Sequence, residues 1–187
     1  MNDDMNNGVA WKGLIAGLAG GLVASWTMNQ FQAVWTRLAE GFEKPHGAQS
    51  MQPSEGDNTL PESTQNKEEQ DDATVKAAKA ISENIFGHEL TKSEKRPAGA
   101  AVHYAFGTVT GGLYGAVAEV APQVTRAAGL PFGVAFWLMA DEMVVPLLRL
   151  SKGPTEYPVS THVYALASHL VYGLSVEMTR RAVRTAL

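Results

Sequence analysis

The sequence predicts an all-α fold, a bundle of four transmembrane helices with a long polar loop between the first and second helices. Three runs contain no Asp, Glu, Lys or Arg, over residues 13–36, 97–118 and 157–176. Each reaches the roughly 20 residues that a helix needs to cross the core of a bilayer. The interval 37–96, in contrast, carries twelve acidic and eight basic residues. We therefore expect lipid-embedded segments joined by a part of the chain that lies in water.

The first helix is expected over residues 11–37, after an N-terminal tail of residues 1–10. Its glycines Gly13, Gly17 and Gly21 recur at every fourth position. An interior glycine costs a helix in water about 1 kcal/mol, whereas small residues four apart let helices in lipid pack closely. The run lacks a convincing small-residue cleavage site near its end. We interpret it as a retained helix and not as a signal peptide.

Residues 38–96 are expected to form the polar extramembrane loop, because this stretch is too rich in Gln, Asn, Ser, Pro and acids to bury an apolar core. A short amphipathic helix is expected within it, near residues 73–86. Asp71 or Asp72 can cap this helix, and Gly87 can end it. Two placements remain open: the helix lies on the bilayer surface, or it is solvated and rests on the bundle.

The remaining transmembrane helices are expected over residues 97–121, 128–150 and 160–184. Prolines mark the joins between them: Pro122, Pro131, Pro154 and Pro158. The helix at 128–150 contains Asp141 and Glu142, so its assignment depends on its length and its neighbours more than on its composition. A loop follows each of these helices except the last.

Glycines are the expected helix-packing residues. The second helix repeats the pattern of the first, with Gly107, Gly111 and Gly115 between His103 and Glu119, each four residues from the next. Residues at this spacing lie along one face of a helix. The full set of predicted packing glycines is Gly13, Gly17, Gly21, Gly107, Gly111, Gly115 and Gly173.

Basic residues predict the orientation of the bundle. Four spans place both termini on one side, and positive charges favour the cytoplasmic side. Basic residues at the end that holds the termini are Lys12, Arg126, Arg180, Arg181 and Arg184. Others at the opposite end weigh against this orientation: Arg37, Lys92, Lys95, Arg96, Arg149 and Lys152. We expect the termini to be cytoplasmic.

Short internal matches suggest a repeat. Tyr-Gly-x-x-x-Glu occurs at 114–119 and again at 172–177, and Trp-x-Met occurs at 26–28 and 137–139. One interpretation is a pair of helical hairpins related by an axis along the membrane normal, as in some transporters. The other is chance, because matches this short arise often.

Four stretches, "HYAFG", "YGAVAEVAP", the "ADE" helix with Pro146, and "SHLVYGLSVEMTRR", resemble the YagU-like bacterial inner-membrane family, a domain of unknown function. The resemblance covers residues 97–184, and the first helix more loosely. It implies a multi-pass protein of the bacterial inner (cytoplasmic) membrane whose activity is unassigned. The polar loop departs most from the family pattern.

Polar residues inside the predicted helices are the candidate site. Ionisable side chains at membrane depth are costly and usually face the bundle interior or a wet cavity. Asp141 and His169 lie at similar depths, where they could share a proton or a water molecule. The layer is either a site for protons or a small solute or a polar clasp that fixes helix pairing. Its members are Asn29, His103, Asp141, Glu142, His162 and His169.

Glu119 and Glu177 lie near the opposite surface. We expect them to form interfacial ion pairs with Arg126, Arg180 or Arg181, which would fix the depth of the helices.

Several classes of chemistry are disfavoured. The chain has no cysteine, its histidines lack a recognised metal-ligand spacing, and its glycine-rich stretches lack the lysine of a phosphate-binding loop. We expect no catalytic residue, no metal and no cofactor, and we favour a role other than catalysis. The net charge of −4 and the lack of a basic patch argue against nucleic acid. The expected partner is the lipid bilayer; in the alternative function, a structural or accessory subunit, the glycine faces bind another membrane protein or a second copy.

Overall fold

The computed structural model describes residues 2–38 and 71–187. These residues form helices and connecting segments without a β-strand, which confirms the all-helical prediction for this part of the chain. The long helices are α1 (Asn2–Leu38), α3 (Lys92–Val120) and α6 (Val159–Ala186). Most of the predicted polar loop, residues 39–70, lies outside the described residues.

Two expected helix starts lie too late in the sequence. Helix α1 begins at Asn2, so the predicted tail of residues 1–10 is mostly helical; no proline interrupts this part of the chain. Helix α3 begins at Lys92 instead of residue 97, because Thr91 and Glu94 form a capping box at its start. The Thr91 hydroxyl and backbone N–H donate to the Glu94 carboxylate at 2.7 and 2.8 Å, and these bonds lower the pKa of Glu94 to about 2.

The third predicted span is a broken helix. It consists of the 3₁₀ segment η2 (Pro122–Gly129), α4 (Leu130–Trp137), the π-helix η3 (Leu138–Val144) and the short α5 (Val145–Leu147). The chain turns sharply within η2, where Ala127 and Ala128 have positive φ. Within the described part of the chain, Pro122–Leu147 is the one helical stretch long and apolar enough to cross a membrane by length and composition. Glycine and polar residues lower the hydropathy of the other three long helices.

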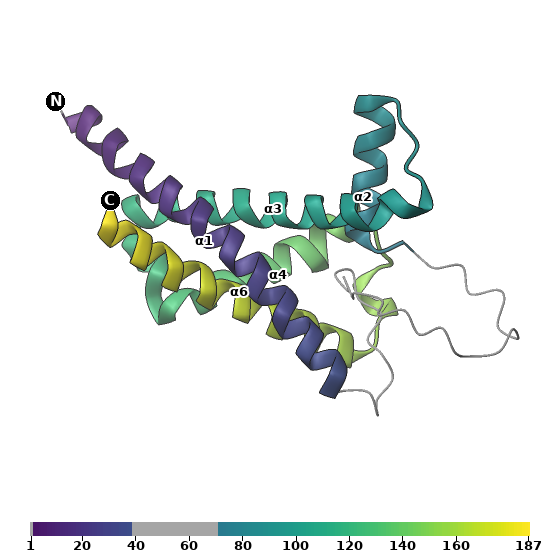
Figure 1. Ribbon diagram of the computed structural model, residues 1–187. Helices are drawn as coiled ribbons and strands as arrows, with labels where there is room; N and C mark the ends of the chain where they lie inside the picture. Colours follow the sequence, from purple (N-terminus) through teal and green to yellow (C-terminus); the bar gives the residue numbers. More distant parts are fainter. Residues whose placement is uncertain (1, 39–70) are drawn as a thin grey trace, which may run out of the picture.

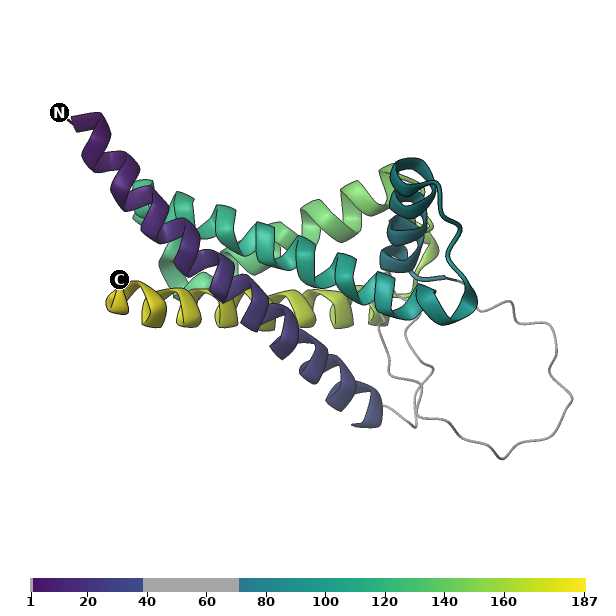
Figure 2. The same cartoon turned by 45° about the horizontal axis from the view of Figure 1, so that its top comes forward.

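These elements pack as one bundle. Helix α1 crosses between α3 and α6 and contacts both, and α4 packs on α6. The chain begins and ends at the same end of the bundle (Figures 1 and 2). At the other end, α2 (Ala73–Ile81) and the π-helical turn η1 (Ser82–Phe86) stand crosswise to α3 (Figure 1). They occupy the stretch for which the sequence predicts a short amphipathic helix.

Glycines make the contact between α1 and α3. A Cβ added to Gly111 would lie 2.5 Å from the Gly21 Cα, and one added to Gly115 would lie 2.7 Å from the Gly17 Cα. Real carbon atoms in contact are about 3.5–4.0 Å apart. The two backbones therefore touch directly, and no side chain fits between them at these positions.

A second glycine contact joins α4 to α6. A Cβ on Gly173 would lie 2.9 Å from the Gly133 Cα and 2.5 Å from the Gly129 carbonyl oxygen. The two contacts are related in sequence, because the separation from Gly17 to Gly129 equals the separation from Gly21 to Gly133. A second separation is common to three further pairs, which are Gly115 and Gly173, Tyr114 and Tyr172, and Glu119 and Glu177. This correspondence favours the repeat interpretation, with α1 and α3 equivalent to α4 and α6.

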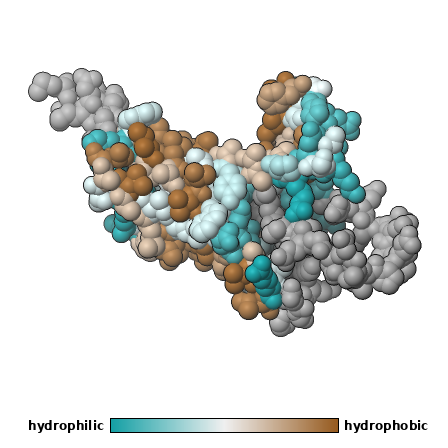
Figure 3. Space-filling view, in the orientation of Figure 1, coloured by the Kyte–Doolittle hydropathy of each residue, from teal (hydrophilic) through white to brown (hydrophobic). Residues whose placement is uncertain are grey.

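Large apolar side chains lie mostly on the outside of the bundle. Leu113 of α3 is 60% exposed and Met178 of α6 is 61% exposed, and apolar side chains gather over the bundle between its two ends (Figure 3). Buried positions instead hold glycine, small polar residues, histidine, and the aromatic residues Tyr114, Phe136 and Tyr172, against which the partly buried Phe132 packs to complete an aromatic cluster. An exposed apolar surface of this size is typical of a site that contacts a membrane or another protein.

Candidate functional site

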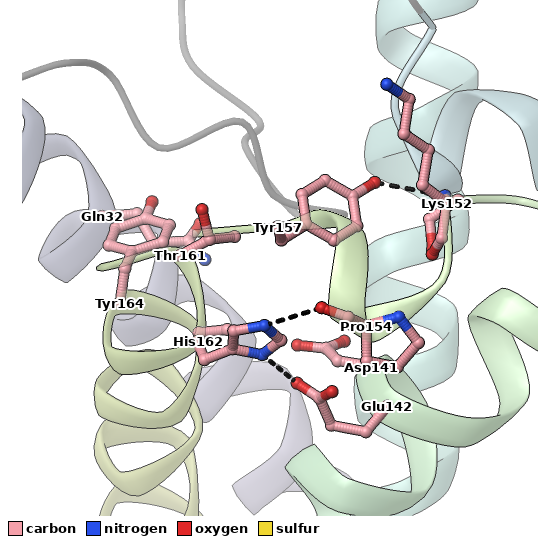
Figure 4. Close-up of a pocket in the computed structure, with 11 residues that line it drawn as sticks. Gln32, Asp141, Glu142, Lys152, Pro154, Tyr157, Thr161, His162 and Tyr164 are labelled. Carbon is pink, nitrogen blue, oxygen red and sulfur yellow. Dashed lines mark hydrogen bonds and ion pairs between the residues drawn. The ribbon is translucent and has the colours of Figure 1, made fainter. Parts of the chain in front are cut away.

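A small cavity of about 30 Å³ lies between α1, η3 and the start of α6, at the end of the bundle away from the termini. Asp141 and Glu142 reach it from η3, and Thr161 and His162 reach it from α6 (Figure 4). Gln32 of α1 lines another wall. A space of this size holds a water molecule or a group of similar size.

Asp141 and His169, which the sequence places at similar depths, lie close together. Asp141 Oδ2 lies 3.6 Å from His169 Nδ1, and the two side chains are 8% and 1% exposed. His169 Nδ1 also lies 2.9 Å from the Ala165 carbonyl oxygen. A carbonyl only accepts, so Nδ1 carries the hydrogen and donates to Ala165. His169 Nε2 is then a buried lone-pair acceptor with no hydrogen-bond partner among the described residues.

His162 forms a second acid–histidine pair, with Glu142. Its Nδ1 donates to Glu142 Oε1 at 2.7 Å, and its Nε2 donates to the Pro154 carbonyl oxygen at 3.0 Å (Figure 4). With an ionised carboxylate on one side and a carbonyl on the other, both ring nitrogens face acceptors. The geometry therefore suits a doubly protonated imidazolium paired with the Glu142 carboxylate.

The π-helix η3 gives both acids access to the cavity. Pro146 follows it, and a proline cannot donate a backbone hydrogen bond and crowds the carbonyl four residues earlier, which here belongs to Glu142. A wider helical turn relieves this crowding. Asp141 and Glu142 both sit in the widened segment, and π-helical turns inside α-helices occur often at functional sites.

Unpartnered polar atoms gather in the same layer. Few buried polar groups in folded proteins lack a hydrogen-bond partner, yet several side chains of this layer have such atoms. Gln32 is 3% exposed and neither its amide oxygen nor its amide nitrogen has a partner in the described part of the chain. The other such atoms belong to Asn29, His103, Trp137, Thr161 and His169.

Asn29 and His103 lie at the edge of the layer. Asn29 Nδ2 donates to the Tyr104 hydroxyl at 3.2 Å, which leaves its Oδ1 without a partner in the described residues. His103 is buried, and its ring packs edge-on against Tyr104. Its Nε2 has no hydrogen-bond partner among residues 2–38 and 71–187.

Aromatic side chains close the bundle beneath the layer. Phe136 meets His169 edge-on at 5.1 Å between ring centres, and Tyr172 lies 5.1 Å from Phe136. Phe132 then stacks on Tyr114 at 4.3 Å. The Tyr114 hydroxyl in turn donates to Glu177 at 2.9 Å, at the end of the bundle that holds the termini. The aromatic cluster therefore separates the cavity from this end.

An ionic network occupies the end that holds the termini. Glu177 is fully buried and accepts hydrogen bonds from Tyr114, Arg180 and Arg181. Glu119 lies 2.8 Å from Arg184 Nε and 3.6 Å from Arg180 Nη1. These acids and bases satisfy one another, as a buried ion pair must to be tolerated.

Arg126 does not join this network. It is exposed, lies at the sharp turn in η2 and forms no ion pair with the described residues. Arg184, which the sequence analysis used only for orientation, pairs with Glu119 in its place. The sequence contains a signal for the pairing of Arg184, because Arg180 and Arg184 are four residues apart and lie on the same face of a helix.

The predicted packing glycines all lie in the two contacts described above or beside them. Gly13 and Gly107 extend the α1–α3 contact, since an added Cβ on either would collide with an atom of the other helix. Gly129 and Gly133, which belong to the α4–α6 contact, were not among the predicted packing glycines. Their spacing of four residues is the spacing of the predicted packing glycines. However, Gly129 lies at the end of the η2 turn, and Pro131 lies between the two glycines, so the sequence did not indicate one continuous helix face.

Comparison with known proteins gives one family. Residues 57–178 match the family model described as "Protein of unknown function (DUF1440)". No curated protein and no solved structure matches the chain. In the described ranges, no group of three or more histidine and acidic side chains is placed to hold a metal ion.

Proposed function

We propose a function from one premise: the chain belongs to the family described as "Protein of unknown function (DUF1440)". In this proposal it is a multi-pass bacterial inner-membrane protein with four spans. Its buried polar layer takes up a proton or a small hydrogen-bonding solute from the side opposite the termini. The resemblance of residues 97–184 to YagU-like inner-membrane proteins supports the bacterial location.

The distribution of side chains supports the membrane location. Leu113 and Met178 point outward, while Gly111, Ser25 and His169 are buried. A soluble bundle has the opposite arrangement, with large apolar residues inside. Both chain ends lie at one end of the bundle (Figure 1), as an even number of spans requires. The arginines of the ionic network lie at that end, which supports cytoplasmic termini.

The observation that carries the function is the group of unpartnered buried atoms around Asp141 and His169. A buried polar atom without a partner costs about 1–3 kcal/mol, and this layer has several. A polar clasp whose only task is to fix helix pairing is expected to satisfy its own members, as the Glu177 network does. The cavity layer leaves donors and acceptors available to a ligand.

The chemistry that fits this layer is proton exchange. His169 Nε2 offers a buried lone pair, and the Asp141 carboxylate lies on the opposite side of the same ring. A proton that enters the cavity can bind to the Asp141 carboxylate, which lines it, and His169 can bind a proton at Nε2 on the far side of the ring. Histidine supports such an exchange because its two nitrogens can exchange donor and acceptor roles.

The aromatic cluster supports access from one side. Phe136 contacts His169 directly and packs in turn against Phe132 and Tyr172. The arrangement therefore fits a binding chamber that opens to the side opposite the termini. Passage across the membrane would require Phe136 and Tyr172 to move.

The test is proton movement into vesicles that hold the purified protein and a pH-sensitive dye. We expect acidification of the outside to cause proton entry, with Phe136 and Tyr172 moving to let the proton pass, and Asp141→Asn to slow this entry by about tenfold, which corresponds to about 1.4 kcal/mol in the barrier. The matched control is Asp71→Asn, which removes an acid that pairs with Lys95 outside the layer. Infrared difference spectra should show a carboxyl band on acidification that only Asp141→Asn removes. Flux equal to protein-free vesicles, together with an Asp141→Asn spectrum like the wild type, would contradict the proposal.

The alternative function, a structural or accessory subunit, ranks second. It requires glycine faces that are open to another membrane protein. Gly17, Gly21, Gly111 and Gly115 are instead covered by one another within the chain. Co-purification of a partner that Gly111→Leu abolishes, without loss of the folded monomer, would favour this alternative.

A further inference from the structure

The helix α2 and the turn η1 have three different faces. Ala73, Val75 and Ala78 are buried against α3. Another face is polar and carries the exposed Lys79–Glu83 ion pair, at 3.8 Å. The exposed large apolar side chains gather at the free end, where Ile81, Ile85 and Phe86 are 43%, 70% and 75% exposed.

Specific contacts fix the position of α2 on the bundle. Val75 packs into the space left by Gly99 of α3, where an added Cβ would lie 2.7 Å from Val75 Cγ2. Lys95 of α3 donates to Asp71, just before α2, at 2.8 Å. The element is therefore attached at one level of the bundle, and it lies crosswise to α3 (Figures 1 and 2). A helix crosswise to a membrane-spanning helix runs along the plane of the membrane.

The level of this attachment matches a membrane interface. Gly99 precedes Phe106 by seven residues, about 10 Å along a helix. Phe106 is the first large apolar side chain exposed on α3 when it is counted from this end. Interfacial helices lie with their apolar face about 5–10 Å into the boundary between headgroups and acyl chains. Helix α2 therefore sits one headgroup layer outside the apolar part of α3.

The apolar surface of the projecting end of α2 and η1 also faces in the direction in which a bilayer around the bundle would lie. In Figure 3 the side of this end that looks toward the apolar part of the bundle is apolar, and the side that looks away is polar. A bilayer around the bundle explains this arrangement, because the apolar side then faces the acyl chains and the polar side faces water. A soluble protein partner would not require the apolar side to face the bundle.

From these observations we propose that the free end formed by Ile81, Ile85 and Phe86 is a lipid anchor. It inserts into the headgroup–acyl boundary of the bilayer that the bundle crosses, and it fixes α2 against the membrane surface. The proposal rests on the membrane location in the proposed function and is independent of proton uptake. It selects the surface-bound placement of the helix near residues 73–86 over the solvated one.

The test uses the absence of cysteine from the chain. Single cysteines replace Phe86, Glu83 and Leu113 in turn, each is labelled with an environment-sensitive fluorophore, and each purified protein is placed in phosphatidylcholine–phosphatidylglycerol vesicles. The vesicles contain lipids with a quencher either near the headgroup or near the end of the acyl chain. The Glu83→Cys label is the matched control on the polar face, and the Leu113→Cys label reports on the bundle surface.

We expect the shallow quencher to reduce the fluorescence of the Phe86→Cys label, the deep quencher to reduce that of the Leu113→Cys label, and neither to affect the Glu83→Cys label. Purified protein in lipid contains no other protein, so quenching at Phe86 identifies lipid as the partner. An unquenched Phe86→Cys label beside a quenched Leu113→Cys label would overturn the anchor and leave the membrane location intact. If the Leu113→Cys label is also unquenched, the membrane location fails together with the anchor.

Discussion

Replacement of Gly111 by alanine tests the backbone contact between α1 and α3. The new Cβ would lie 2.5 Å from the Gly21 Cα and 2.7 Å from the Gly17 carbonyl oxygen. Carbon atoms in contact are about 3.5 Å apart or more, and a backbone cannot swing aside as a side chain can. The two helices must therefore separate locally by about 1 Å. Overpacking of this kind costs about 1–3 kcal/mol, and the better helix propensity of alanine returns about 1 kcal/mol.

Gly112→Ala is the matched control, one residue away on the same helix. Its Cβ would meet only side-chain atoms, with Leu18 Cδ2 at 2.7 Å and Leu14 Cδ1 at 3.2 Å, and these leucines can change rotamer. The measurement is the free energy of unfolding in mixed micelles, from a titration with a denaturing detergent followed by tryptophan fluorescence. We expect Gly111→Ala to be at least about 1 kcal/mol less stable than Gly112→Ala. Equal stability of the two variants would refute the contact geometry.

Other predictions concern the two ends of the bundle. Tyr114→Phe removes a hydrogen bond to the buried Glu177 carboxylate and should lower the free energy of unfolding by about 1.5–3 kcal/mol; no loss in the same detergent titration would contradict the network. The pKa of Glu94 lies at about 2, below its ordinary value of 4.5, so its cap stabilises the start of α3 fully above pH 4.5 and is lost as the pH falls through 2. An NMR titration should show this, and Thr91→Val should return the pKa toward its ordinary value; an unchanged pKa would exclude the capping box. Asp72→Ala removes the side-chain cap of α2 and should destabilise that helix by about 1 kcal/mol, seen as faster amide exchange in α2 than in α3.

Much of the helical architecture could be predicted because local patterns encode it. Uncharged runs marked the helices, and glycines at every fourth position marked the faces where backbones meet. The sequence did not say which glycine faces which, because that depends on how each helix is rotated and crossed. Gly17 meets Gly115, and Gly21 meets Gly111, only because α1 and α3 run in opposite directions past each other.

The candidate site was predictable in its acids and histidines but not in its pairing. Asp141 and His169 were placed at one depth from the sequence, since depth follows from counting residues along a helix. The pairing of Glu142 with His162 depends on the π-helix around Asp141, which changes the direction of each side chain relative to a regular α-helix. Pro146 was the visible cause of that change, although proline alone does not reveal how a helix adjusts.

Gln32 and Thr161 were missed as cavity residues for a different reason. Uncharged polar side chains are common in helices, and nothing in their type shows that they are buried without a partner. Gln32 lies three residues after Asn29, on the same face of α1, which was the available signal. Their burial depends on the packing of α1 against α6 and becomes visible only in three dimensions.

Hydrocarbon is the medium that the exposed apolar side chains of the bundle require in the proposed membrane location. The most direct measurement is the reaction of single cysteines with a membrane-impermeant maleimide in native membranes. We expect Leu113→Cys, exposed at 60% on the outside of α3, to stay unreacted until detergent dissolves the membrane, while Glu83→Cys reacts at once. Equally fast reaction of both cysteines in intact membranes, or a protein that remains folded and monodisperse without detergent, would contradict the account.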